Sequence, residues 1–260
     1  MIAENGLKLV YLKRQLARFL RQVPPLYHFA TKVYGKVSNY INSRTWVKER
    51  YWARREIAES YWNNREHPSK KFLGERIAAF APIHSILEVG CASGPNLWLL
   101  ANRFPEAEIV GVDINPEAVN FGNDQFAKEG ISNAKLSVGK ADELGQFRDK
   151  AFDIVFTNAL LIYVGPNKIE GVIQQMLRLT RRALVLMECH CWEPDKDPKG
   201  KGFFVGRNWI RDYQALLRQF VPKEQIRITK IPKEVWSDDP WETFGAVIQV
   251  VMDRRYGNAV

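Results

Sequence analysis

Cysteine is scarce in this sequence of 260 residues, which contains only Cys91, Cys189 and Cys191. So low and odd a number excludes a disulfide framework as the main source of stability. His190 lies between the last two cysteines, but the remaining histidines are scattered and do not complete a zinc-binding spacing. We therefore expect no metal site, and we expect the thiols to be buried and reduced.

Long hydrophobic runs are also lacking. No stretch approaches the roughly 20 consecutive apolar residues that a membrane-spanning helix needs. Basic residues interrupt the first 30 positions, so no apolar core of a signal peptide is present: Lys8, Lys13, Arg14, Arg18 and Arg21. With 46% hydrophobic residues the chain has the composition of a globular protein, and we expect it in the cytoplasm.

Acidic residues are few in the first quarter of the chain. Residues 1–65 contain 13 Lys or Arg and four acidic residues, whereas the rest contains 25 of each. The whole net charge of +9 therefore belongs to residues 1–65. This asymmetry predicts an anionic partner for that segment, either a membrane surface or nucleic acid.

The segment from Leu9 to Val23 is predicted to form an amphipathic helix that ends before Pro24. Its apolar residues fall on one side and its arginines on the other, which suits residues 7–23 to an anionic bilayer surface. A helix packed on its own domain is an equal alternative, and nucleic acid is less favoured. The sequence does not indicate an oligomeric state.

From Ser85 onward, short β-rich runs alternate with helical patterns, as in a parallel sheet covered on both faces. Strands are predicted over 85–90, 108–113, 135–138, 152–158, 183–188, 226–231 and 246–252. Helices are predicted over 46–64, 70–80, 96–103, from 116 onward, 169–179 and 209–220. Because residues 232–245 are predicted to be a loop, the last strand should be antiparallel. We thus expect an α/β, doubly wound, seven-stranded Rossmann-like domain at 67–260, after a helical extension at 1–66.

The strongest motif is Leu87-Glu-Val-Gly-Cys-Ala-Ser-Gly94, a strand that ends in a small-residue turn. Such a turn lets the backbone approach a ligand, and the next helix offers unpaired N–H groups. Glu88, two positions before the first glycine, favours a ligand with positive charge over a pyrophosphate. Asp113 closes the second strand, where a carboxylate can accept both hydroxyls of a ribose. Asp142 follows the third strand and can either bind the amine of adenine or cap a helix.

The runs ILEVGCASGPNLWLLA, IVGVDINPEAV, GKADEL and FDIVFTNALLIYV resemble, in this order, four motifs of class I S-adenosylmethionine-dependent methyltransferases. The resemblance covers residues 72–189 best, and Ala92 stands where the family usually has glycine. It implies S-adenosylmethionine as cofactor, with its methionine part at Gly90, Ala92 and Gly94, and its ribose at Asp113. It further implies adenine at Asp142 and the methyl group beside Asn158. The expected cofactor site also includes Glu88, Ile114 and Ala141.

Transfer to an acceptor oxygen would require a general base in addition to positioning. Glu188 ends the fifth predicted strand, His190 follows it, and Tyr163 follows the fourth, where an acceptor is expected to enter. His190 is the preferred base because the ordinary pKa of histidine suits neutral pH. A loop histidine without a catalytic role is an equal alternative.

The acceptor class is narrowed by motifs that are lacking. Residues 158–161 read Asn-Ala-Leu-Leu, whereas enzymes that methylate the exocyclic amines of nucleic-acid bases usually have an Asn/Asp-Pro-Pro-aromatic run there. Cytosine-C5 methylation is also disfavoured, because no Pro-Cys follows the fourth strand to supply the cysteine nucleophile. The N-terminal segment is similar in style to basic starts of bacterial surface-polysaccharide enzymes. We therefore expect an O-methyltransferase for a small-molecule or glycan hydroxyl, held peripherally at the cytoplasmic membrane. The alternatives are an RNA methyltransferase that binds phosphates through its N-terminus, and a non-catalytic cofactor-binding protein.

Overall fold

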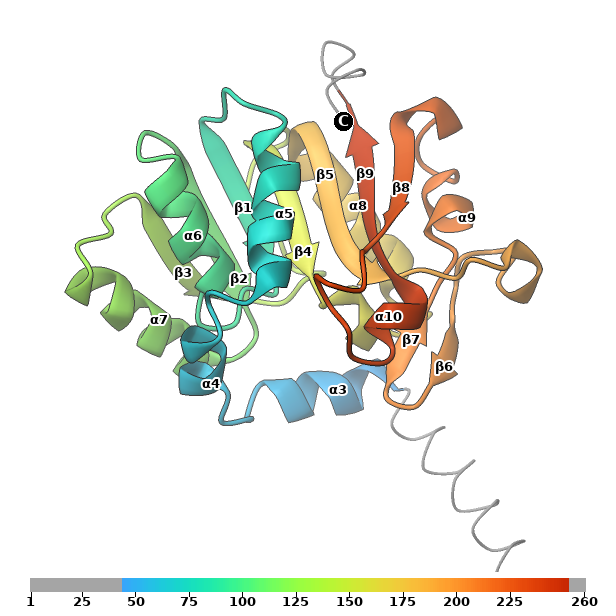
Figure 1. Ribbon diagram of the computed structural model, residues 1–260, viewed down its shortest axis with the longest axis horizontal. Helices are drawn as coiled ribbons and strands as arrows, with labels where there is room; N and C mark the ends of the chain where they lie inside the picture. The colour runs from blue at the N-terminus through green and yellow to red at the C-terminus, as the bar shows by residue number, and fades with distance from the viewer. Residues whose placement is uncertain (1–43, 253–260) are drawn as a thin grey trace, which may run out of the picture. The chain divides into compact units, whose positions relative to one another are not determined.

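A seven-stranded sheet forms the centre of the protein (Figure 1). The computed structural model describes residues 44–252, so the predicted helix Leu9–Val23, and residues 7–23 as a whole, lie outside the described part. The strand order is β3-β2-β1-β4-β5-β9-β8. The strands are β1 (Ser85–Val89), β2 (Glu108–Asp113), β3 (Ala134–Val138), β4 (Phe152–Asn158), β5 (Thr180–Cys189), β8 (Ile226–Lys230) and β9 (Gly245–Val251).

The direction of the strands agrees with the sequence prediction. Neighbouring strands from β3 through β5 pair in parallel, and β9 pairs antiparallel with both β5 and β8. β1 and β9 are buried along their whole length, because helices cover both faces of the sheet. The doubly wound, Rossmann-like fold with an antiparallel last strand is confirmed.

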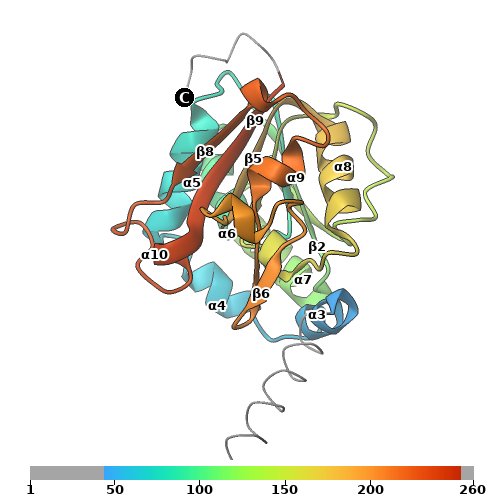
Figure 2. The same ribbon diagram turned by 90° about the vertical axis from the view of Figure 1, so that its right-hand side faces the viewer.

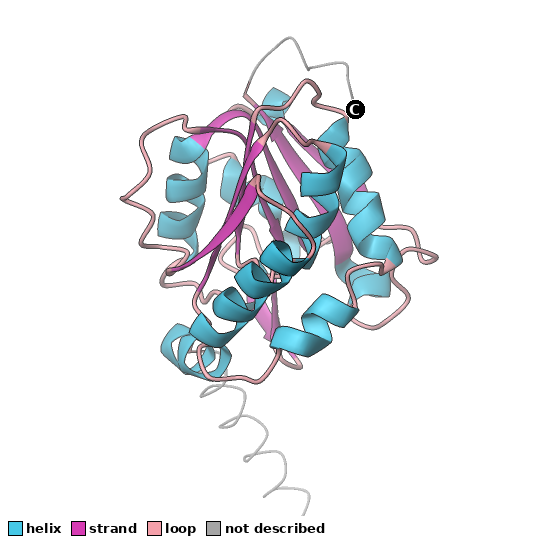
Figure 3. Ribbon diagram, turned by 90° about the vertical axis from the view of Figure 1, so that its left-hand side faces the viewer, coloured by secondary structure: helices cyan, strands magenta, loops and turns pink. Residues whose placement is uncertain are grey.

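Two hydrophobic cores lie on the two faces of the sheet. One core contains side chains of α5 (Pro68–Ala78), α6 (Pro95–Arg103) and α7 (Pro116–Lys128). The other contains side chains of α8 (Ile169–Leu179) and α9 (Tyr213–Leu217). Figures 2 and 3 show these helix layers on opposite sides of the strands. Short 3-10 turns complete the fold at η1 (Leu161–Tyr163), η2 (Pro194–Lys196) and η3 (Lys223–Gln225).

The predicted helix over 46–64 is in fact two helices, α3 (Thr45–Trp52) and α4 (Ala58–Asn63). The chain turns between them because the amide of Asn115 donates hydrogen bonds to the carbonyls of Trp52 and Arg55, and because Ile57 is buried. Both helices belong to the same compact unit as the sheet. The structure therefore does not support the predicted boundary after residue 66.

The predicted helix over 209–220 is also wrong in its first part. Residues Asn208–Ile210 form β7, which pairs with β6 (Phe203–Val205) in a hairpin whose turn contains Gly206 at a φ of 61°. The side chain of Asp212 accepts a hydrogen bond from the Ala215 N–H and so begins the shorter helix α9. The predicted loop over 232–245 holds the four-residue helix α10 (Trp241–Phe244). No helix within residues 44–252 is long and apolar enough to cross a membrane.

Candidate active site

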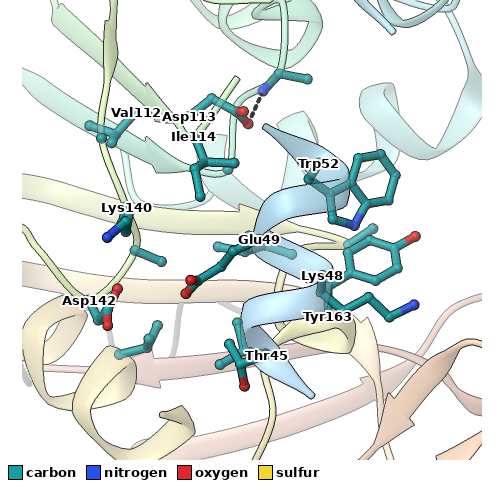
Figure 4. A pocket seen from close by; sticks show the side chains of 18 of the residues that line it. Thr45, Lys48, Glu49, Trp52, Val112, Asp113, Ile114, Lys140, Asp142 and Tyr163 are labelled. Atoms are coloured by element: carbon teal, nitrogen blue, oxygen red, sulfur yellow. Dashed lines mark hydrogen bonds between the residues drawn. The ribbon is translucent and has the colours of Figure 1, made fainter. Parts of the chain in front are cut away.

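A pocket lies where β1, β2 and β4 end, and α3 runs across it (Figure 4). Including its open mouth, it encloses about 880 Å³, within the range of small-molecule sites. It is lined by strand-end residues, by α3 and its neighbours, and by the start of α8: Gly90, Ala92, Val112, Asp113, Ile114, Gly139, Lys140, Ala141, Asp142, Asn158, Ala159, Leu160, Thr45, Lys48, Glu49, Trp52, Ile57, Tyr61, Tyr163, Val164, Lys168 and Val172.

The turn after β1 brings backbone to the wall of this pocket. Gly90 and Ala92 both line it, with φ angles of 80° and 48° in the left-handed region. A side-chain carbon at Gly90 would lie 2.8 Å from Leu160 Cδ1, so glycine is required there. Gly94, in contrast, caps the start of α6 and does not line the pocket. Its expected contact with the ligand is not supported; a side chain there would collide with Phe126.

Asp113 is held at the end of β2 by backbone donors. Its two carboxylate oxygens accept hydrogen bonds from the N–H groups of Ala92 (2.7 Å) and Asn115 (2.8 Å). Burial raises the pKa of Asp113, and these N–H groups oppose that rise. Each oxygen keeps a lone pair, so this carboxylate can still accept hydrogen bonds from the hydroxyls of a ligand in the pocket. Ile114 forms the neighbouring part of the wall.

Asp142 takes part in an ion cluster that the sequence did not predict. Lys168 Nζ lies 2.7 Å from Asp142 Oδ2 and 2.6 Å from Glu49 Oε1, and so joins the turn after β3, the start of α8 and helix α3. Burial lowers the pKa of Lys168, but its two carboxylate partners raise it overall. No helix begins at Asp142, so the alternative role as a helix cap is wrong. Ala141 lies beside it on the pocket wall.

Glu88 reaches the pocket only through other side chains. It is 1% exposed, does not line the pocket, and accepts a 2.6 Å hydrogen bond from the amide of Asn96. Asn96 in turn accepts a 3.4 Å bond from the amide nitrogen of Asn158. Asn158 Oδ1 is left buried without a hydrogen-bond partner in residues 44–252. Glu88 is thus a positioning residue, and the oxygen of Asn158 is the group available to a ligand.

Glu88 also predicts a dependence of stability on pH. Burial, opposed by Asn96 and Lys70, raises its pKa from 4.5 to about 8, so the folded state holds a proton that the unfolded state releases. The contribution of Glu88 to the free energy of unfolding is fully present below pH 4.5 and is lost as the pH rises to about 8. We expect the melting temperature of wild type, relative to that of Glu88→Gln, to fall between pH 5 and 8 in calorimetry. The exposed control Glu106→Gln should parallel wild type; equal slopes for all three proteins would contradict this account.

Residues 86–183 match the family model described as a methyltransferase domain. The chain is 43% identical over 58 residues to ribosomal RNA small subunit methyltransferase H of Coprothermobacter proteolyticus, matching 22% of this chain and 19% of that protein. It is 31% identical over 93 residues to malonyl-[acyl-carrier protein] O-methyltransferase of Acetivibrio thermocellus, matching 36% and 30% respectively. The chain thus spans less than a third of either relative.

Among solved structures, geranyl diphosphate C-methyltransferase from Streptomyces coelicolor aligns with a TM-score of 0.55. The alignment has 14% identity and covers 71% of this chain and 78% of that structure, so it bears on the fold. With the pocket and the family model, one assignment follows. Residues 86–183 resemble a methyltransferase domain, and the fold is that of class I S-adenosylmethionine-dependent methyltransferases.

Of the expected catalytic residues, only Tyr163 lines the pocket that the structure describes. Its ring lies 4.7 Å from that of Trp52, and burial raises its pKa above the ordinary value, so the phenol keeps its proton. Tyr163 can therefore donate a hydrogen bond but is unsuited to accept a proton at neutral pH.

The structure gives Glu188 and His190 other roles. Glu188 is fully buried at the end of β5, where it accepts hydrogen bonds from the Thr157 hydroxyl and from the N–H groups of Leu160 and Ile162. It therefore shapes the turn that carries Tyr163, although burial raises its pKa to about 7. His190 lies outside the pocket, its Nδ1 accepts from the Tyr213 N–H, and burial lowers its pKa. The geometry does not support either residue as the base.

The residues missed by sequence reasoning all come from the cover of the pocket. Lys48, Glu49 and Trp52 lie on α3, and Lys168 precedes α8. Only the density of aromatic and charged residues in 46–64 distinguished this segment in the sequence. The three cysteines are free and buried as expected, and residues 44–252 contain no group of His, Cys, Asp or Glu placed to hold a metal.

Proposed function

We propose that this chain transfers a methyl group from S-adenosylmethionine to an oxygen of a small-molecule acceptor. The observation that carries the proposal is the half-buried carboxylate of Asp113, fixed by backbone donors and facing the pocket beside the Gly90 turn. S-adenosylmethionine supplies a methyl group already activated by a positively charged sulfur. The protein's contribution is therefore mainly binding and orientation.

The residues of the pocket fit the three parts of this cofactor. Asp113 would accept hydrogen bonds from the ribose hydroxyls. Asp142 would accept a hydrogen bond from the adenine amine through the oxygen that Lys168 leaves free. The unpartnered Oδ1 of Asn158 would accept a hydrogen bond from the ammonium group of the methionine part. The absence of a side chain at Gly90 leaves room for the ligand against the backbone.

Helix α3 would complete the site by excluding water. Thr45 accepts a hydrogen bond from the Gly165 N–H and donates one to Asn167, while Glu49 pairs with Lys168. These bonds hold the helix across the pocket, with Trp52 facing Tyr163 (Figure 4). A covered, largely apolar pocket favours a small acceptor over a folded RNA. A relative named malonyl-[acyl-carrier protein] O-methyltransferase supports oxygen as the acceptor atom.

An RNA acceptor is the second candidate, because one relative is named a ribosomal RNA methyltransferase and residues 1–65 are strongly basic. Filter binding to RNA at increasing salt separates the two. Affinity that falls steeply with salt, together with methyl transfer to RNA, would favour this candidate.

A location at the cytoplasmic membrane, with a glycan or lipid-linked acceptor, is a further part of our proposal. It is supported by the basic and apolar pattern of residues 7–23. Co-sedimentation with anionic vesicles tests it, with neutral vesicles as the control. Equal sedimentation with both kinds of vesicle would contradict it.

Isothermal titration calorimetry with S-adenosylmethionine and S-adenosylhomocysteine tests the central proposal. We expect binding in the micromolar range for both, one molecule per chain. A folded protein that binds neither would contradict the proposal. Binding without methyl transfer to any acceptor would favour a role other than methyl transfer. A structural neighbour with this fold is named a [4+2]-cyclase (TM-score 0.53, 17% identity, covering 69% of this chain).

A further inference from the structure

The pocket has two chemically different sides, which α3 separates. Figure 4 shows Glu49 extending toward Lys140 and Asp142, whereas Lys48, Trp52 and Tyr163 lie together on the other side. The first side belongs to the cofactor if the proposed function holds. The second is therefore the side left for the acceptor, and the following inference rests on that proposed function.

The acceptor side contains a positive charge that has no counter-ion among the residues that the structure describes. Lys48 Nζ lies 5.5 Å from the centre of the Tyr163 ring and donates a 3.1 Å hydrogen bond to the carbonyl of Arg207. Among residues 44–252, Lys48 forms no ion pair with a carboxylate. Burial and the charge of Arg207 both lower the pKa of Lys48. The charged form of a half-buried lysine beside a second cation is stabilised when an anion binds next to it.

A second unsatisfied donor lines the same side. The indole N–H of Trp52 is buried and has no hydrogen-bond partner within the described residues. Trp98, in contrast, donates its indole N–H to Glu129. An indole can only donate, so an acceptor atom of a ligand would satisfy Trp52. The phenol of Tyr163 keeps its proton and adds a third donor.

Each carboxylate that lines the pocket is already engaged. Glu49 and Asp142 share Lys168, and Asp113 accepts two backbone hydrogen bonds. No histidine is among the lining residues that the structure describes. The acceptor side thus offers hydrogen-bond donors and positive charge, but no carboxylate or imidazole that could remove a proton from an alcohol.

From this arrangement we infer that the acceptor is a carboxylate on an apolar or aromatic body, bound by Lys48, Trp52 and Tyr163. This replaces the expected hydroxyl by an oxygen that is ionised at neutral pH. The carboxylate oxygen forms the new bond to the methyl carbon as the carbon–sulfur bond breaks, and that electron pair remains on sulfur. The negative carboxylate and positive sulfonium become a neutral ester and a neutral thioether, and no proton is released.

The test uses the full-length chain saturated with S-adenosylhomocysteine and two carboxylate probes, phenylacetate and octanoate. Their neutral counterparts, 2-phenylethanol and 1-octanol, share the same bodies. We expect the carboxylates to bind more tightly than the alcohols in calorimetry. Lys48→Met should weaken carboxylate binding on the order of tenfold, the usual effect of losing a charge-assisted hydrogen bond. The exposed control Lys71→Met should bind like wild type.

Lys48→Arg separates anion binding from proton removal, because arginine keeps its charge and does not deprotonate. We expect this variant to retain most of the carboxylate affinity and the methylation of phenylacetate to an alkali-labile ester. The inference is overturned if the alcohols bind as well as the acids, if neither acid binds, or if Lys48→Met changes nothing. Failure of S-adenosylhomocysteine to bind would instead contradict the proposed function, and the first titration detects that separately.

Discussion

Asp113→Ala is expected to weaken the binding of S-adenosylhomocysteine on the order of 100-fold. The substitution removes the carboxylate proposed to accept both ribose hydroxyls, and two charge-assisted hydrogen bonds account for a loss of this size. Calorimetry on the purified protein measures it. The exposed control Asp124→Ala on α7 should leave the affinity within a factor of about two, since an exposed substitution away from the pocket has little effect.

Loss of the Asp113 carboxylate also leaves the N–H groups of Ala92 and Asn115 without acceptors, so the variant is expected to be less stable. Asp113→Asn keeps the shape of the side chain and one acceptor oxygen, and a melting curve shows whether each variant is folded. We expect Asp113→Asn to be folded and still bind weakly. Wild-type affinity in either folded variant would show that this carboxylate does not hold the ligand.

Gly90→Ala is expected to abolish measurable binding of S-adenosylhomocysteine and to destabilise the fold. The left-handed φ of 80° costs a non-glycine residue about 1–2 kcal/mol. The new methyl group would lie 2.8 Å from Leu160 Cδ1, and such overpacking adds about 1–3 kcal/mol. The change also alters the pocket wall at the point of closest backbone approach. Urea unfolding and calorimetry measure the two effects.

Gly130→Ala provides the matched control, since Gly130 has a φ of 71° but no atom within 4 Å of the position of the added carbon. It should show the backbone cost alone and bind normally. The double variant Gly90→Ala, Leu160→Ala should recover part of the stability by relieving the collision. If Gly90→Ala and Gly130→Ala lost the same stability and both bound the ligand, the close approach would be without consequence.

Local patterns predicted most of the framework. Phe152–Asn158 and Ile169–Leu179 begin and end where the alternation of apolar residues and the helical period placed them. Asp113 lies at the carboxyl end of its strand, beside the Gly90 turn, because parallel strands bring these ends to one edge of the sheet. Those relations depend on neighbours in sequence and on a general topological rule.

The errors arose where distant contacts determine local structure. Trp209 lies in a hairpin strand although its segment has a helical pattern, because pairing with Phe204 replaced helix hydrogen bonds. Glu188 was one of the catalytic candidates because it lies at the end of a strand near the expected acceptor. Its burial and its hydrogen bonds to Thr157 and to the turn after β4 make it structural instead.

The sequence by itself determined the doubly wound fold, the turn at Gly90 and the carboxylates at the strand ends. Each of these features depends on the order and period of nearby residues. Only the tertiary structure decided that α3 covers the pocket and that Lys168 joins Glu49, 119 positions earlier, to Asp142. The same holds for the position of Lys48 beside Tyr163. Which charges meet across such separations depends on how helices pack on the sheet, and local periodicity carries no information about that packing.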